Sequence, residues 1–259
     1  MPIKADSHAL STLVIVLIVT IIVGIVVVAA AAAVFLRLWH PLGHVVGSGS
    51  LATEPKDFTD FTTVEAGWGF EVRIDHADSH SVKITADDNM FDYIEISQTG
   101  DTITIGLKWG YSYQDVTLRA DITMPQLHEL RFSGGTHGSI EGFDSSHEFE
   151  VELSGGSHLS GGFTTSEDVQ FALSGGSHLI ELEGAANNLR ISASGGSRLD
   201  LPEFSVHNAT INLSGGSSAT VNLDGILDGN LSGGSHLKYL GDPTIVDVNT
   251  SGGSTVGPQ

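Results

Sequence analysis

Histidines at a regular spacing are the first residues in this sequence whose types and positions suggest chemistry. His137, His158 and His178 each stand four residues after the serine of a Ser-Gly-Gly triplet, at spacings of 21 and 20 residues. If the chain folds back once per spacing, the three imidazoles become stacked neighbours about 5 Å apart. At that distance they could share a soft divalent metal ion or titrate together.

The same position in later triplets is not reserved for histidine. It holds Arg198, Ser218, His236 and Thr255. The residue that follows is mostly apolar, so the alternation of a strand turns this position toward solvent. The alternative interpretation is therefore an exposed column that tolerates many residue types and binds no metal.

Three aromatic residues spaced two apart form a second candidate site. Trp109, Tyr111 and Tyr113 would share one face of a strand. If exposed, they offer a platform for a sugar ring or a protein contact. If packed inward, they close the end of a core, and both interpretations stay open.

No pattern in the chain predicts catalysis or a cofactor. Ser157 and His158 are adjacent and point to opposite faces of a strand, so they cannot pair as nucleophile and base. Gly-x-Ser-x-Gly, a phosphate loop and His-Glu-x-x-His are absent from the sequence.

The enzyme alternative is a β-helical enzyme that cleaves acidic polysaccharides. Residues 133–259 carry 15 Asp and Glu against three Lys and Arg, an excess that repels an anionic sugar.

The overall charge narrows the class of protein further. The 259 residues include 11 Lys and Arg and 31 Asp and Glu, which gives a formal net charge of −20. Such a chain lacks the clustered cations that neutralise phosphates, so we expect no nucleic-acid partner. It contains no cysteine, which excludes disulfides and thiolate chemistry.

A repeat of about 20 residues must position these side chains. Ser-Gly-Gly recurs seven times, at spacings of 21, 20, 20, 20, 18 and 19 residues, and alternating apolar residues precede most of the triplets. Alternation predicts strands, and the unit is too short for a strand with a packed helix. The sequence therefore predicts an all-β fold, a parallel β-helix of about seven turns with a β-rich N-terminal cap, preceded by one transmembrane helix.

Paired glycines are expected at the corner of each turn. There the backbone needs a positive φ, or a side chain would strike the next turn. The predicted corners are Gly134, Gly135, Gly155, Gly156, Gly175, Gly176, Gly195, Gly196, Gly215, Gly216, Gly233, Gly234, Gly252 and Gly253.

The amino-terminal region predicts a membrane anchor. Residues 10–36 carry no charge, and a helix of this length spans roughly 40 Å, more than the roughly 30 Å hydrocarbon core. A cleaved signal peptide is the alternative, because Lys4 precedes the run and Ala29 to Ala33 offer small residues for cleavage.

Five segments follow from this organisation. They are a short cytoplasmic tail at 1–9, the transmembrane helix at 10–36, a stalk at 37–57, the β-rich cap at 58–132 and the β-helix repeats at 133–259.

Several motifs together resemble a known family. They are the phased Ser-Gly-Gly-Ser-x-Leu units, the run Ile84-Thr85-Ala86-Asp87-Asp88-Asn89, and the segment His236-Leu237-Lys238-Tyr239-Leu240-Gly241-Asp242-Pro243. Over residues 58 to 256 the chain resembles the family named putative auto-transporter adhesin, head GIN domain. The resemblance implies an extracytoplasmic β-helical domain, often membrane-attached, and it supplies no catalytic residues.

The expected function is thus a non-catalytic adhesion or binding module, held in the cell membrane by a single pass with its C-terminal domain outside the cell. Its expected partners are the lipid bilayer, through residues 10–36, and a glycan or a surface protein. A self-associating envelope protein, built as a homo-oligomer, is the alternative from another class.

Overall fold

The computed structural model describes residues 43–259, and almost all of their regular structure is β-strand. They divide into two compact units: residues 43–45 with 109–114, and residues 46–108 with 115–259. In the first unit β1 (Gly43–Val46) and β8 (Tyr111–Gln114) form a two-stranded sheet. The second unit contains the repeats.

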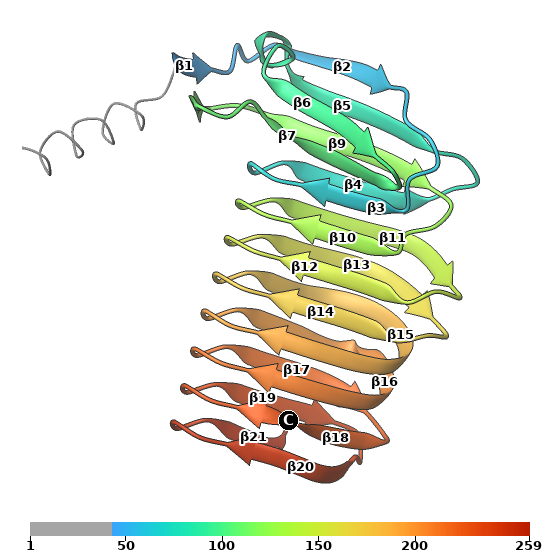
Figure 1. The fold of residues 1–259 in the computed structure, drawn as a ribbon, viewed down its shortest axis with the longest axis vertical. Coiled ribbons are helices and arrows are strands. Elements are labelled where there is room, and N and C mark those ends of the chain that lie inside the picture. Colours follow the sequence, from blue (N-terminus) through green and yellow to red (C-terminus); the bar gives the residue numbers. More distant parts are fainter. Residues whose placement is uncertain (1–42) are drawn as a thin grey trace, which may run out of the picture. The chain divides into compact units, whose positions relative to one another are not determined.

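In the second unit, turns of the chain stack on one another to form two parallel sheets joined by corners (Figure 1). The first sheet holds the strands before each corner: β3 (Thr63–Ala66), β10 (Glu129–Phe132), β12 (Phe149–Leu153), β14 (Val169–Leu173), the ends of β15 (His178–Ala193) and β16 (Arg198–Leu213), β18 (Ile226–Leu231) and β20 (Thr244–Thr250). The second sheet holds the strands after each corner: β4 (Glu71–His76), β11 (His137–Ser145), β13 (His158–Thr165), the beginnings of β15 and β16, β17 (Ser218–Leu223), β19 (His236–Leu240) and β21 (Thr255–Pro258).

Antiparallel strands cover the N-terminal end of this stack. β7 (Thr102–Leu107) pairs in parallel with β3 and antiparallel with β6 (Ile94–Thr99). On the second sheet β9 (Leu118–Met124) pairs with β4, then with β5 (Ser81–Asp87), which pairs with β2 (Leu51–Lys56). A 3₁₀ turn, η1 (Asp88–Met90), follows β5. In-register stacking already begins at β3 and β4, which pair with β10 and β11.

The predicted all-β solenoid is confirmed, with about six turns where the sequence predicted about seven. The predicted transmembrane helix at 10–36 lies outside the described residues. Within residues 43–259 no helix has the length and apolar character to cross a membrane.

Inward-facing apolar residues fill the interior between the two sheets. The largest fully buried side chains are mostly phenylalanines: Phe61, Phe70, Phe132, Phe149, Phe163, Phe171 and Phe204. The rings of Phe149 and Phe163 stack with their centroids 4.0 Å apart. Burial of such rings is the main stabilising term of the fold.

Gly138, in the first repeat, stands where the next repeats have an inward-facing leucine, and the reason is packing. Gly138 pairs with Leu159, which pairs in turn with Leu179. A Cβ on Gly138 would lie 2.0 Å from the ring of Phe132. The phenylalanine ring thus occupies the space that leucine side chains fill in the following turns.

All fourteen corner glycines have positive φ angles, but the two members of a pair differ in their surroundings. A Cβ on Gly175 would lie 3.1 Å from the amide nitrogen of Gly155 in the preceding turn. A Cβ on Gly176 would meet nothing within 4 Å. The first glycine allows the turns to approach, while the second only supplies the left-handed conformation.

Buried hydroxyls complete the corners. Thr136 and the serines at the equivalent position as far as Ser235 are fully buried, for example Ser157 and Ser177. The Ser177 hydroxyl donates a hydrogen bond of 2.8 Å to the carbonyl oxygen of Ser174 in its own corner. From Ser157 to Ser235 these hydroxyls donate within their own corner. At the last corner the Ser254 hydroxyl instead accepts a hydrogen bond of 3.0 Å from the Ser235 amide of the preceding turn.

We expect substitution of the two glycines in one corner to separate these effects. Gly176→Ala forces alanine into a positive φ and should cost about 1–2 kcal/mol of unfolding free energy. Gly175→Ala adds the clash with the preceding turn and should cost clearly more. Urea unfolding of both variants, followed by circular dichroism, measures the difference. Equal losses would contradict this account of the corner.

Candidate binding faces

The second sheet brings the predicted histidines together. His137 pairs with His158, and His158 pairs with His178. The ring centroids are 4.7 Å apart in the first pair, with the rings nearly parallel at 4°, and 4.6 Å apart in the second pair, tilted by 37°. The spacing thus matches the stack that the repeat predicts.

The central ring of this stack sits in an unfavourable place for a positive charge. Among residues 43–259, His158 Nδ1 is one of two buried side-chain polar atoms without a hydrogen-bond partner. Burial lowers the pKa of His158, and the neighbouring His137 and His178 lower it further. The ring therefore resists protonation while the fold is intact.

The stacked geometry does not present a metal site. Nitrogen lone pairs lie in the plane of each imidazole, so parallel stacked rings do not direct them at one point. Within the described part of the chain no group of three His, Asp or Glu side chains is arranged to hold a metal ion. The metal interpretation stays a prediction that requires the rings to rotate out of the stack.

Charged residues continue this column above and below the histidines. Glu71 pairs with His137 on one side, and Arg198 pairs with His178 on the other. Glu71 forms an ion pair with Arg119, and Arg198 forms one with Asp200; the nitrogen–oxygen distance is 2.9 Å in both. Surface pairs of this kind are weak and open to competition.

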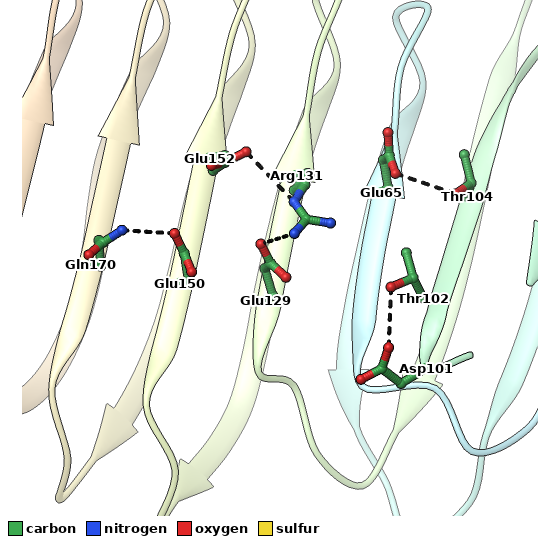
Figure 2. Close-up of polar contacts among 9 residues, drawn as sticks. All are labelled: Glu65, Asp101, Thr102, Thr104, Glu129, Arg131, Glu150, Glu152 and Gln170. Atoms are coloured by element: carbon green, nitrogen blue, oxygen red, sulfur yellow. Dashed lines mark hydrogen bonds and ion pairs between the residues drawn. The ribbon is translucent and has the colours of Figure 1, made fainter. Parts of the chain in front are cut away.

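The first sheet carries a different outer surface, which is mainly acidic. Figure 2 shows Arg131 between two glutamates. It forms an ion pair with Glu129, and its Nε atom lies 3.7 Å from a carboxylate oxygen of Glu152. In the next turn the Gln170 amide donates a 2.8 Å hydrogen bond to Glu150. One arginine, Arg131, is thus shared by two carboxylates.

This surface is hollowed into an open groove of about 790 Å³. Loops preceding the strands contribute His128 and His147, whose ring centroids are 4.6 Å apart, along with Asp168. Burial raises the pKa of Glu129 at the floor of the groove, an effect that Arg131 partly opposes. Burial lowers the pKa of His128, and the neighbouring His147 lowers it further.

Amide side chains form a ladder along the groove. The Asn208 amide donates to the Asn188 side-chain oxygen at 2.8 Å, and the Asn188 amide donates to Asp168 at 2.7 Å. This groove was not predicted from the sequence. The signal was present, because Glu129, Glu150 and Gln170 follow the same spacing of 21 and 20 residues as the triplets.

The predicted aromatic site lies in the smaller unit. Tyr111 and Tyr113 lie on β8, half-buried, with ring centroids 6.2 Å apart. Trp109 lies in the turn before β8 and is 78% exposed. The role of these three residues as a binding platform stays a prediction.

Stacked turns, glycine corners and in-register side-chain columns define the repeat unit as a parallel β-solenoid. The family model described as "Putative auto-transporter adhesin, head GIN domain" matches residues 60–243. The chain belongs to this family, as the motifs of the sequence predicted. A comparison with curated proteins found no match.

Solved structures show the same fold. A putative adhesin from Bacteroides fragilis is 17% identical, with a TM-score of 0.74, and the match covers 83% of this chain and 100% of that one. A putative lipid binding protein from Parabacteroides distasonis is 18% identical, with a TM-score of 0.67 and coverage of 83% and 99%. A putative adhesin from Parabacteroides merdae is 18% identical, with a TM-score of 0.63 and the same coverage.

We expect His158 to make stability depend on pH. Because its pKa is lowered in the folded state, the unfolded chain binds more protons at this residue near pH 6. Its contribution to stability is complete above about pH 6.5 and decreases as the pH falls. The urea midpoint should therefore fall with acidification, and it should fall less in His158→Gln.

His236→Gln serves as the control for this experiment. His236 occupies the same column but bonds to Thr255 at 2.8 Å and lies outside the histidine stack. The control should keep the pH dependence of the unmodified chain. An identical pH profile in His158→Gln and the unmodified chain would contradict the prediction.

Proposed function

We propose that this chain is a membrane-anchored surface protein whose solenoid acts outside the cell as a non-catalytic adhesion or binding module. The observation that carries the proposal is the regularity of the two outer surfaces. Residues at equivalent positions of successive turns form columns along both sheets, as in the pairs of His158 with His178 and Glu150 with Gln170. Such a surface offers many equivalent contacts rather than one centre.

Three further observations support the proposal. Membership of an adhesin family agrees with a role at the cell surface. The uncharged run at 10–36 supplies the anchor that such a role needs. The adjacent serine and histidine at 157–158, 177–178 and 235–236 recur at one position of the repeat, which suits a structural role better than a catalytic pair.

A screen of the full chain in detergent micelles against arrayed glycans and bacterial and host cells tests the binding function. We expect a specific hit whose apparent affinity rises with the density of the displayed target, because many turns engage at once. An unrelated protein of similar net charge is the control. Failure to exceed that control on any target would contradict a binding role.

Self-association is the second candidate, and the last turn favours it. On β20 the residues Ile245 and Val246 are 46% and 64% exposed, and the strand pairs along one edge with β18. Exposed apolar strands at a sheet edge are prone to pair with another chain. If the rods associate, light scattering should show a mass that rises with protein concentration, and Val246→Lys should abolish that rise. A mass independent of concentration would exclude this candidate.

A further inference from the structure

The run Asp87-Asp88-Asn89, called here the clamp, lies where β5 ends and η1 begins, and it takes no part in the binding faces described above. Asp87 is the only charged residue that is buried among residues 43–259, with 1% exposure. A buried carboxylate costs free energy unless hydrogen-bond donors surround it. The donors to Asp87 therefore show which parts of the chain this residue holds.

Both donors to the Asp87 carboxylate are backbone amides. Gly49 donates to Oδ1 and Thr117 donates to Oδ2, each at 2.7 Å. Hydrogen bonds to an ionised carboxylate are roughly twice as strong as those between neutral groups. Gly49 belongs to residues 46–50, called here the strap, which lead from β1 into β2, and Thr117 follows β8. One side chain thus holds two segments that are distant in the sequence.

Asp88 and Asn89 bind the rest of the strap. The Ser48 hydroxyl donates to Asp88 Oδ1 at 2.6 Å, and the Ser48 amide donates to Asn89 Oδ1 at 3.1 Å. The Asn89 side-chain amide donates to the Val46 carbonyl oxygen at 2.8 Å. The Asp88 backbone amide donates to the Ser50 carbonyl oxygen at 2.8 Å. With the amide that bonds to the buried carboxylate, four of the five strap residues are bonded to the clamp.

Gly47, the remaining strap residue, lies directly against the clamp. A Cβ at this position would lie 2.8 Å from Asp87 Oδ2 and closer still to the carbonyl oxygen of Asp115. Any side chain would push the strap away from the carboxylate. The strap can follow this path only because residue 47 is glycine.

The clamp stands where tension from the N-terminal side would reach the solenoid. β2 follows the strap and lies beside β5 (Figure 1), and within residues 43–259 its residue pairs are all with β5. The first of these pairs joins Leu51 to Asp87. Tension on the chain before β2 acts first on the bonds nearest its point of entry, so a strand with one partner peels from that end. The clamp bonds precede that end and must break before β2 can peel.

We propose that the clamp resists tension, holding the strap and the segment after β8 on the solenoid while the membrane anchor is pulled. The inference rests on the proposed function, because an anchored adhesion module carries tension between its target and the membrane. Gly49 and Thr117 bond to different oxygens of one carboxylate, so tension on the strap is shared with the second segment. The clamp therefore has a mechanical role that is separate from binding.

Pulling on single molecules of the full chain in detergent micelles tests this role. The chain has no cysteine, so Ser194→Cys at an exposed corner supplies one unique handle, and the amino terminus supplies the other. Asp87→Asn replaces one acceptor oxygen of the carboxylate and removes its charge. At a fixed force we expect this variant to raise the rate at which the strap and β2 are released by about tenfold or more.

A second pulling geometry separates resistance to tension from a general contribution to stability. With handles at Ser194→Cys and the carboxyl terminus, tension bypasses the clamp, and Asp87→Asn should leave the opening rate unchanged. An equal rise in both geometries would overturn the inference. Glu54→Gln is the matched control, because it removes an exposed ion pair with Lys56 on β2 without changing the clamp. This control should keep the rate of the unmodified chain in both geometries.

An exposed position keeps the outcome decisive if Asp87→Asn fails to fold. Ser48→Ala removes the hydroxyl that bonds to Asp88, and it should raise the release rate in the amino-terminal geometry by a smaller factor. Circular dichroism checks that the fold is kept. No rise in this variant would overturn the inference. If the release rates stay unchanged while the glycan or cell screen gives a hit, the inference falls and the proposed function stands.

Discussion

Parallel pairing in register from one turn to the next is the constraint on which the rest of the structure depends. Strands that pair in this way set equivalent residues about 4.8 Å apart, whatever their side chains are. Apolar residues then form columns in the interior, and polar residues form columns on the outside. The core packing of Phe149 on Phe163 and the ring stack of His137 on His158 are two results of this one geometry.

Register can be kept only if every turn changes direction at the same place. The paired glycines do this with two positive φ angles, and the buried hydroxyl of Ser177 or its equivalents satisfies the carbonyl that the tight bend leaves inside. Later in each turn the chain is less regular. Bulges occur between Ile140 and Phe143 and between Leu159 and Gly161, where the paired strands shift register.

The sequence predicted those features that repeat and missed those that occur once. A spacing of 20 or 21 residues was enough to place His137, His158 and His178 side by side, because period alone determines that contact. The glycine at position 138, where the next repeats have leucine, could not be explained from the sequence, because its cause is the Phe132 ring that fills the space of the leucine side chain. The groove escaped prediction because part of its lining comes from loops, whose conformations follow no period. The antiparallel strands of the cap likewise lack a repeat that would reveal their partners.

Contacts limited to adjacent turns also bear on how such a protein changes over evolutionary time. Duplication or deletion of one whole unit of about 20 residues leaves every remaining rung with a neighbour of the same kind. The reach of the molecule can therefore be adjusted in increments of about 4.8 Å while the cap and both side-chain patterns stay intact. Units of 18 and 19 residues between later triplets show that the outer loops absorb small changes in length without loss of the corners.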